Sequence, residues 1–567
     1  MLLIFNRLCS ILQRNDKKKL SIVLLLTILM AFVDMVGVLS IVPFLTTIAN
    51  AEMVNQNPVL VKLQHVLSAE DYRDFVIKLG ILTIFIVFVS TFLKVFNKYY
   101  INRFSNLQRH YLSNRLLRIY LSQNYSFFIE NESSNLAKNI LSDVDKIVSG
   151  VINPLLSIVS YSLVIFFMGG MVFLYEPVVA VVSLFFLFFV YLILYFSLSN
   201  KLKKMGVINR EINKLRYKLC HEVFLGIKDV KLNNLADKYI NNYNCNSRLY
   251  AENLAKNSII SNIPQNLIEL LGYIGLIFLS ISLLLLLSDI EKVLPIIGLY
   301  GFAAYRMLPA AQNIYKSLST LNFTNEIFEK ISDDFQLVKS TYLGENQEIS
   351  FSETINFENV DYGYANNTIV FNKLNIKIYK NSFIGIVGES GCGKSTFFDL
   401  FSGLIFPDSG RILIDNSELS ESNVISWRRK IGYVPQTIYL FDTTIAENIG
   451  VSENSSVNIE KVILAAKKAN IHDFIVNNLE QGYNSLVGEK GIKLSGGQRQ
   501  RIGIARALYS DPEVILMDEA TSALDNETAL QITENLKELA KDKTVLVIAH
   551  RKEALIYCDQ IIDFGKF

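Results

Sequence analysis

The sequence predicts a six-span α-helical membrane domain followed by an α/β domain of the P-loop class. The 567-residue chain is 51% hydrophobic and only 19% charged, and the hydrophobic excess lies almost entirely before residue 320. That half contains repeated apolar segments, whereas short β-like runs, turns and a glycine-rich loop follow from about residue 350. Because the chain is too long for one ordinary domain, we expect a membrane domain over 1–325, a linker over 326–350 and the α/β domain over 351–567.

The composition argues against several classes of protein. A net charge of +2 gives no support for a nucleic-acid partner. The first apolar run begins near Leu20 and is too long for the core of a cleavable signal peptide. The cysteines lack C-x-x-C spacing, so neither a metal site nor a disulfide framework is expected. These cysteines are Cys9, Cys220, Cys245, Cys392 and Cys558.

Six apolar segments are long enough to cross a membrane. Each reaches the ~20 residues that a helix needs to span the bilayer core. Helices are the expected form because a backbone in lipid must satisfy its own hydrogen bonds. The segments cover residues 20–49, 76–96, 153–175, 178–198, 258–287 and 293–318.

Basic residues predict the orientation of these spans. The N-terminal tail and the segments 97–150 and 199–256 are rich in lysine and arginine, whereas the intervening connections are short or poor in positive charge. By the positive-inside rule the tail and both long segments are cytoplasmic. Their apolar residues have helical spacing, so the spans should extend beyond the membrane. The chain must reverse direction within each long segment, and we expect short helices at the reversals, Tyr125–Asn131 and Phe224–Lys231. These helices either touch the α/β domain or simply close a helical hairpin.

The connection between the first two spans contains a short amphipathic stretch, Val59–Leu67. We expect a helix there, at the outer surface. Two roles are open for it: contact with the membrane interface or a substrate, and capping of the helix bundle.

Four charged residues lie inside or near the ends of the apolar spans: Asp34, Lys94, Glu269 and Arg306. Ionisable groups at this depth indicate function or buried pairing. The guanidinium of Arg306 would suit a phosphate or pyrophosphate head group, but an internal salt bridge with Glu269 or Asp34 is the equal alternative. Lys94, near the cytoplasmic end of its span, is expected to snorkel toward water.

The stretch Gly388–Thr396 has the pattern of a phosphate-binding loop, since it follows the apolar run Phe383–Val387 and leads into a helical segment. Its backbone N–H groups and the helix N-terminus would bind phosphate. Lys394 can reach the outer phosphates, and Ser395 can ligate Mg²⁺. The expected nucleotide contacts here are Gly388, Ser390, Gly391, Cys392, Gly393, Lys394, Ser395 and Thr396.

Further residues along the chain complete an ATPase pattern. Tyr364 precedes the loop and could stack on adenine or be a core tyrosine. Gln436 follows a strand and could ligate Mg²⁺ or position water, or be a turn residue. The signature Leu494–Gln498 opens a helix, where Ser495, Gly496, Gly497 and Gln498 form a second anion-binding surface.

Two carboxylates end the apolar strand that follows the signature. Asp518 suits Mg²⁺ coordination, and Glu519 suits activation of the attacking water. The segment Ser522–Asp525 comes next, and His550 ends another strand, where it could contact the γ-phosphate or be structural.

The order of these motifs resembles the nucleotide-binding domain of ABC transporters, and six spans before one such domain resemble an exporter-type half-transporter. The resemblance implies a homodimer with ATP and Mg²⁺ between the subunits, each ATP lying between Lys394 of one copy and Ser495 of the other. It also implies nucleotide contacts at Tyr364 and Asp525, a metal role for Gln436, and catalytic roles for Glu519, His550 and Gln436.

The segment Ala304–Asn313, together with the outer helix and Glu269, resembles bacterial flippases of lipid-linked oligosaccharides. A polyprenyl-pyrophosphate glycan would fit a cavity arginine such as Arg306, with Glu269 as the second expected substrate contact. Such a protein would lie in the bacterial inner membrane with its ATPase in the cytoplasm. Exporters of peptides, lipid A-like lipids or drugs share the architecture and stay open as alternatives, whereas ABC proteins outside transport lack membrane spans.

Overall fold

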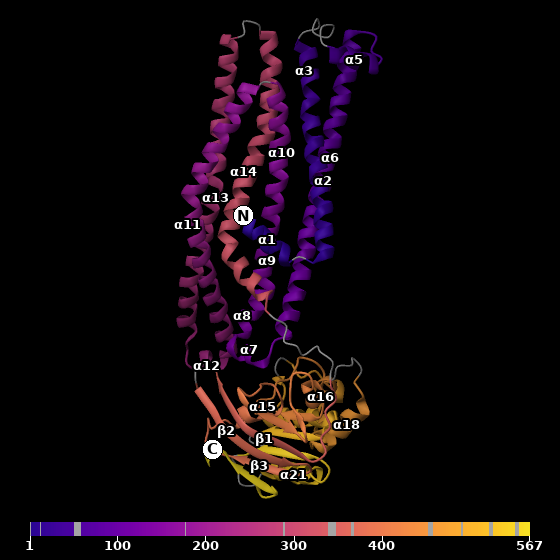
Figure 1. The fold of residues 1–567 in the computed structure, drawn as a ribbon, viewed down its shortest axis with the longest axis vertical. Coiled ribbons are helices and arrows are strands. Elements are labelled where there is room, and N and C mark those ends of the chain that lie inside the picture. The colour runs from indigo at the N-terminus through magenta and orange to yellow at the C-terminus, as the bar shows by residue number, and fades with distance from the viewer. Residues whose placement is uncertain are drawn as a thin grey trace. The chain divides into compact units, whose positions relative to one another are not determined.

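The computed structural model divides the chain into two compact units (Figure 1). The first contains residues 1–121 and 131–338, and the second contains residues 122–130 and 339–567. The residues that the structure describes are 2–11, 13–49, 58–175, 177–286, 290–337, 347–364, 368–451, 457–488, 491–520, 526–549 and 555–566.

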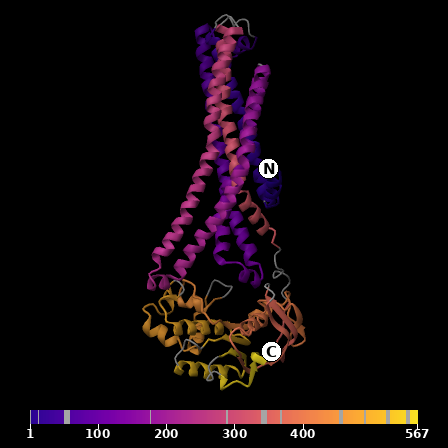
Figure 2. The same cartoon turned by 90° about the vertical axis from the view of Figure 1, so that its left-hand side faces the viewer.

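The first unit is a bundle of long helices, which both views show (Figures 1 and 2). The described residues of each of the six predicted apolar segments lie in these helices, the first segment being divided between α2 and α3. The helices are α1 (Leu2–Ile11), α2 (Arg14–Leu39), α3 (Ile41–Ala49), α5 (Pro58–Val66), α6 (Tyr72–Leu121), α8 (Ser133–Lys138), α9 (Val144–Ile147), α10 (Asn153–Tyr175), α11 (Pro177–Leu225), α12 (Ile227–Leu232), α13 (Ala236–Leu286) and α14 (Ile290–Asp334).

Three helical stretches among the described residues are long and apolar enough to cross a membrane: Arg14–Ile48, Tyr72–Leu121 and Ser133–Leu174. The remaining predicted spans lie in α11, α13 and α14, which have 49, 51 and 45 residues. At 1.5 Å rise per residue, such helices are roughly twice as long as a bilayer core is thick. They therefore extend well beyond the membrane, as the helical spacing predicted. Helix α14 continues to Asp334, so the predicted boundary at residue 325 falls inside it.

The outer helix α5 packs on the bundle through its apolar side. Leu60 is buried in one cluster with Phe75 and Leu79, at the start of α6. Val59 and Val66, on the other side of α5, are 58% and 79% exposed. Of the two roles left open for this helix, the described contacts are those of a cap on the bundle.

Helix α14 approaches its neighbours closely enough to require glycine. A Cβ at Gly206 of α11 would lie 2.2 Å from the backbone oxygen of Phe323. A Cβ at Gly150, in the π-helical segment η2 (Val148–Ile152), would lie 2.4 Å from Cγ2 of Thr324. The Thr324 hydroxyl instead donates to the Gly150 carbonyl at 2.8 Å. These contacts fix the cytoplasmic part of α14 against two other elements.

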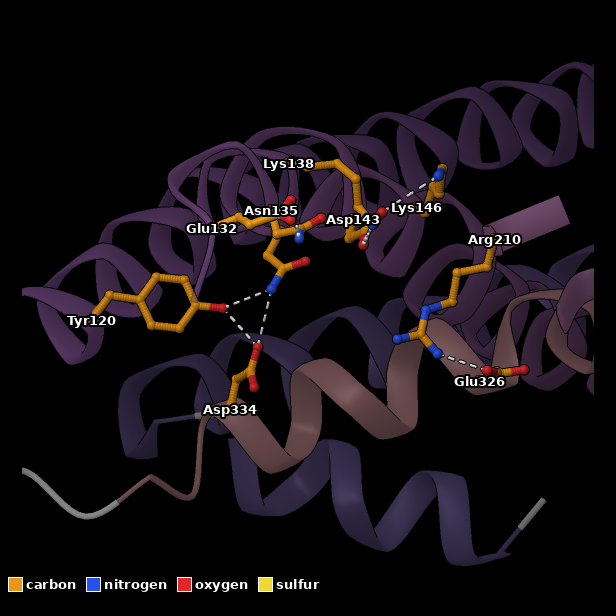
Figure 3. A network of polar contacts seen from close by, with 10 residues as sticks. Tyr120, Glu132, Asn135, Lys138, Asp143, Lys146, Arg210, Glu326 and Asp334 are labelled. Carbon is orange, nitrogen blue, oxygen red and sulfur yellow. Dashed lines mark hydrogen bonds and ion pairs between the residues drawn. The ribbon is translucent and has the colours of Figure 1, made fainter. Parts of the chain in front are cut away.

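A buried polar network lies at the end of α14 (Figure 3). The Tyr120 hydroxyl donates to Asp334 Oδ2 at 2.6 Å. Asn139 Nδ2, in the π-helical segment η1 (Asn139–Asp143), donates to the Tyr120 oxygen at 3.0 Å and to Asp334 Oδ2 at 3.3 Å. Tyr120 and Asn139 are 2% and 3% exposed, so these bonds are shielded from water. The network joins three segments close to the points where the chain leaves the first unit, after Tyr120 and Asp334, or has re-entered it, before Asn139.

The second unit contains two sheets. The antiparallel sheet has the order β2-β1-β4-β5, and the parallel sheet has the order β6-β7-β8-β3-β9. The strands are β1 (Thr354–Tyr364), β2 (Thr368–Tyr379), β3 (Phe383–Val387), β4 (Ser409–Ile414), β5 (Ser417–Glu418), β6 (Ile431–Val434), β7 (Val514–Asp518), β8 (Thr544–Ile548) and β9 (Gln560–Asp563).

The central strands of the parallel sheet are buried on both faces, as a continuous apolar sequence predicts. Along β7, Ile515 and Met517 point into one hydrophobic core, and Val514 and Leu516 point into the other. Helices pack on these cores: α15 (Lys394–Phe401), α16 (Val424–Arg429), α17 (Ile445–Ile449), α18 (Ile459–Lys468), α19 (His472–Asn478), α20 (Gly496–Tyr509) and α21 (Asn526–Leu539).

The second unit also takes in helix α7 (Tyr125–Glu130), which the chain reaches long before the α/β domain. Residues on α7, such as Ile129 and Glu130, line one hollow with Tyr364, Leu404 and Arg411. The expectation that the first reversal touches the α/β domain is therefore confirmed. The second reversal carries α12, which belongs to the first unit, and its contact with the α/β domain stays a prediction.

Candidate nucleotide-binding site

The phosphate-binding loop connects β3 to α15, and its conformation depends on glycine. Gly391 and Gly393 have φ angles of +87° and +94°, a region that favours residues without a Cβ. A Cβ at Gly393 would also lie 2.7 Å from Cγ1 of Val370. Because Gly393 directly precedes α15, its conformation aims the first N–H groups of the helix into the loop.

Lys394 places a positive charge inside this loop. Its Nζ donates to the carbonyl oxygens of Gly388 and Glu389, both at 2.8 Å. The side chain is 8% exposed, so its charge acts in a largely desolvated setting. Cys392 lies beside it, with Sγ 3.9 Å from the ammonium. The loop therefore combines converging backbone donors with a buried cation, which suits a polyphosphate.

Two oxygen ligands suited to Mg²⁺ meet beside the loop. The Ser395 hydroxyl donates to Oδ2 of Asp518 at 3.1 Å. This contact arises because β3 and β7 are parallel strands on either side of β8, so the residues that follow them gather at one edge of the sheet. Hydroxyl and carboxylate oxygens are the hard ligands that Mg²⁺ prefers, and the residues present fit the ion.

Glu519 follows Asp518 and has an unusual backbone. Its φ is +49°, and its N–H donates to the Ile548 carbonyl at 3.1 Å. A non-glycine residue in this conformation is strained by about 1–3 kcal/mol, and such strain concentrates at functional sites. Gln436 Nε2 donates to Oε2 of Glu519 at 3.0 Å. The predicted metal, water-activating and water-positioning side chains thus form one group, although in this arrangement the Gln436 amide is bound to Glu519.

Sequence reasoning missed one carboxylate of this group, Asp399. Burial, and next to it the charge of Asp518, raises the pKa of Asp399 to about 6. Burial and the Asp399 charge also raise the pKa of Tyr125, on α7. The signal was available, because Asp399 lies four residues after Ser395 and so on the same face of α15.

Tyr364 lies against the loop helix through a polar contact. Its hydroxyl is 3.0 Å from the Thr396 hydroxyl, and its ring packs edge-on against Tyr362 with centroids 5.3 Å apart. Thr396 is 7% exposed. The described contacts belong to a partly buried tyrosine at the edge of the core, and its stacking on adenine stays a prediction.

The signature segment forms its own helix start. Ser495 caps α20 by accepting from the Gln498 N–H at 3.3 Å, while the Gln498 side chain accepts from the Ser495 N–H at 2.8 Å. This reciprocal pair fixes the turn that contains Gly496 and Gly497. The described hydrogen bonds of the Ser495 and Gln498 side chains stay within the signature.

Two predicted site residues, Asp525 and His550, lie outside the described residues. So do Glu489 and Lys490, just before the signature.

Three of the four charged residues in or near the apolar spans of the membrane unit form one buried cluster, which includes one of the two salt bridges expected for Arg306. Arg306 Nη2 lies 3.7 Å from Asp34 Oδ1, and Lys94 forms a second ion pair with the same oxygen. Ser90 donates to it at 3.1 Å. The expectation that Lys94 snorkels to water is wrong, because the buried Asp34 carboxylate on the facing helix holds its ammonium. Of the alternatives for Arg306, the structure contains the salt bridge to Asp34.

Glu269 stands apart from that cluster. It accepts from the Tyr273 hydroxyl at 3.2 Å and lines a hollow of about 570 Å³ between α13 and α14. Polar residues further along α14 line the same hollow, including Gln312, Asn313 and Lys316.

Comparison with protein families matches both halves of the chain. Residues 371–522 match the family described as ABC transporter, and residues 20–299 match the ABC transporter transmembrane region. A solved structure, described as a bacterial Atm1-family ABC exporter with ATP bound, superposes with a TM-score of 0.80. That match covers 97% of this chain and 94% of the other at 22% identity, so it bears on the fold.

Curated relatives match over part of their length. The chain is 38% identical over 238 residues to ABC transporter B family member 2 of Dictyostelium discoideum. It is 43% identical over 213 residues to the alpha-hemolysin translocation ATP-binding protein HlyB of Escherichia coli, and 44% over 213 residues to the leukotoxin translocation ATP-binding protein LktB of Mannheimia glucosida. These matches cover 42%, 37% and 37% of this chain, and only 17%, 30% and 30% of those relatives.

Proposed function

Because the chain is an ABC transporter with an exporter-type transmembrane region before its nucleotide-binding domain, we propose that it hydrolyses ATP to drive a cargo across a membrane. The observation that carries this proposal is the gathering of Lys394, Ser395, Asp518 and Glu519 at one sheet edge. Catalysis of phosphoryl transfer needs positioning and charge neutralisation, and these side chains supply both.

Each residue of the group has a distinct task. Lys394 and the loop N–H groups hold the outer phosphates, while Ser395 and Asp518 would hold Mg²⁺. The bound ion would neutralise charge on the phosphate oxygens. Glu519 accepts a proton from the attacking water, and Gln436 orients that carboxylate through the 3.0 Å bond. His550 would contact the γ-phosphate, and Asp525 would support the nucleotide from the segment after Glu519.

Substitution of Glu519 by Gln tests this assignment. The amide keeps the size of the side chain but cannot accept the proton, so steady-state ATP hydrolysis should fall by at least ~100-fold. Binding of a fluorescent ATP analogue should change by less than about threefold, because the phosphate contacts remain. Normal hydrolysis in the variant would remove Glu519 from the mechanism.

The signature helix start supports a homodimer. Its capped N-terminus, around Ser495, forms an anion-binding surface, but its described side-chain bonds do not reach the phosphate loop of the same chain. A second copy placed head to tail would bring Ser495 onto the ATP held by Lys394. A cysteine pair introduced at Ser495 and Ser390 should therefore cross-link between subunits of Glu519→Gln only when ATP is present. Cross-linking that does not depend on ATP would contradict the proposed arrangement, in which ATP lies between the two subunits.

For the cargo, we propose a lipid-linked oligosaccharide with a pyrophosphate, flipped from the cytoplasmic to the outer leaflet of a bacterial inner membrane. Two cations, Lys94 and Arg306, surround the single carboxylate of Asp34, so this cluster carries an excess positive charge within the membrane unit. Arg306 is 31% exposed on its side chain and so keeps donors for an anion. The polar hollow beside Glu269 offers hydrogen bonds to sugars.

Export of a polypeptide is the alternative, since HlyB and LktB are described as toxin translocation proteins. Because this chain covers less than a third of those relatives, the likeness bears little on cargo. Reconstituted protein with a fluorescent lipid-linked oligosaccharide separates the two. Flipping of this lipid that requires ATP would support the lipid cargo. If the lipid is not flipped and does not stimulate an otherwise normal ATPase activity, the lipid cargo is rejected.

A further inference from the structure

A small groove lies between α11 and α13, away from both the charged cluster and the hollow beside Glu269. It has a volume of about 400 Å³. The two helices pack along each other and run side by side in the lower part of the bundle in both views (Figures 1 and 2). The groove is lined by Lys201, Lys204, Met205, Lys256, Ile259 and Ile260.

The groove lies at one depth on both helices, at the basic end of two predicted spans. On α11, Lys201 and Lys204 follow the apolar segment 178–198 directly, and on α13 Lys256 comes just before the segment 258–287. Since the helices are antiparallel neighbours, these positions meet where hydrocarbon gives way to phosphate head groups. The positive-inside rule places this end in the cytoplasmic leaflet.

The three lysines carry charge that no described partner neutralises. The ion pairs found among the described residues include none with Lys201, Lys204 or Lys256. The acidic residue nearest in sequence to Lys256 is Glu252, which pairs with Arg248 at 3.0 Å. The surface of the groove itself is apolar, so the three lysines line it with their stems, while their positive charges lie outside that lining.

The floor of the groove is apolar. Ile259 is 58% exposed, and Met205 and Ile260 are partly buried beside it. Lysine stems can lie along such a surface while their ammonium groups reach the head-group layer. A ligand that matches the groove needs an anionic phosphate next to a hydrocarbon chain. Basic pockets between membrane helices on the cytoplasmic side bind phospholipid head groups through this combination.

We propose that this lysine groove binds an anionic phospholipid, with its phosphate among Lys201, Lys204 and Lys256 and an acyl chain along Ile259 and Ile260. Each lysine near an anionic membrane surface favours the anionic lipid by about fivefold, so three give a preference of up to roughly a hundredfold. The preference should weaken with salt, because the ammonium groups are exposed.

The test measures lipid that stays bound to the full-length protein. The protein in detergent is incubated with equimolar phosphatidylglycerol and phosphatidylcholine and then purified away from unbound lipid. The lipids that stay bound are quantified by mass spectrometry. The variant K201Q/K204Q/K256Q should lose at least about tenfold of the phosphatidylglycerol preference. The matched control K203Q/K214Q/K238Q removes the same charge from exposed lysines on the same helices and should keep it.

Several outcomes decide the proposal. An equal preference for phosphatidylglycerol in the wild type and the groove variant would overturn it. So would a loss of that preference in the control variant as large as in the groove variant. Glycerophosphoglycerol, which has the head group but no acyl chains, should displace the lipid only weakly; displacement at the affinity of phosphatidylglycerol itself would assign the groove to soluble phosphates instead. If the triple variant fails to fold, K256Q alone should still lower the preference by about fivefold.

Discussion

The protonation of Asp399 provides a quantitative test of the nucleotide-binding site. Burial, with the Asp518 charge as the second cause, raises the pKa of Asp399 from 3.8 to about 6. A shift of ~2 pKa units corresponds to about 3 kcal/mol, at 1.36 kcal/mol per unit. Because the carboxyl is partly exposed, solvent screening reduces the expected cost of its charge to about 1–2 kcal/mol. Asp399→Asn removes the charge and should stabilise the domain at pH 7.5 by that amount.

The pH dependence follows from the direction of the shift. Between pH 3.8 and about 6, the folded protein retains a proton on Asp399 that the unfolded chain releases. The stability contributed by the raised pKa is therefore fully present below 3.8 and is lost as the pH rises through about 6. The advantage of Asp399→Asn should be complete at pH 7.5 and fall to about one third by pH 4.5.

The single tryptophan of the chain makes this measurable in the intact transporter. Trp427 is fully buried in the nucleotide-binding domain, and its indole N–H donates to the Phe401 carbonyl, at the end of α15, at 2.8 Å. Its fluorescence reports the unfolding of the domain that holds Asp399. A gain of 1–2 kcal/mol should raise the midpoint by about 3–6 °C at pH 7.5. A shift of the same size at pH 4.5, or none at pH 7.5, would refute the reasoning.

Three further predictions follow from close contacts. Gly393→Ala should weaken binding of a fluorescent ATP analogue at least about tenfold, because its Cβ would strike Val370, whereas Gly391→Ala has open space around its Cβ and should weaken it less. Tyr120→Phe should destabilise the helical bundle by about 1.5–3 kcal/mol, measured by thermal unfolding followed by circular dichroism, because the buried hydrogen bonds of the hydroxyl are lost. The control Tyr99→Phe, at an exposed position on the same helix, should not destabilise it. Equal effects of the two substitutions would show that the network does not contribute to stability. Arg306→Ala should reduce lipid flipping by about tenfold while basal ATPase activity changes little, since Lys94 still pairs with Asp34; equal loss of both would indicate a structural arginine.

The phosphate loop and the Asp518–Glu519 pair were predictable because local pattern and sheet topology determine them. A glycine-rich turn between strand and helix has few conformations, and parallel strands bring their carboxyl ends to one edge. The contact between Ser395 and Asp518 follows from these two facts.

Partners across the helix bundle were not predictable in the same way. Asp34, Lys94 and Arg306 lie on three helices, and a sequence gives neither the rotation of each helix nor its axial position relative to the others. Each charge was identified from its place in an apolar span, but the pairing of Lys94 depends on packing. The spacing of Asp399 from Ser395 places both on one face of α15, but that spacing alone gives neither the burial of the Asp399 carboxyl nor its interaction with Asp518.

The discontinuity of the second unit has a consequence for how the protein is made. Residues 122–130 emerge from the ribosome more than two hundred residues before the segment 339–567 that α7 packs with. Domains form as units during synthesis. Helix α7 therefore cannot pack in its final position until the part of the same chain that forms the surface around Leu404 and Arg411 has been translated. A fragment beginning at residue 339 would expose that surface and would be expected to aggregate more readily than the whole chain. Supplying residues 122–130 as a separate peptide should restore solubility to such a fragment.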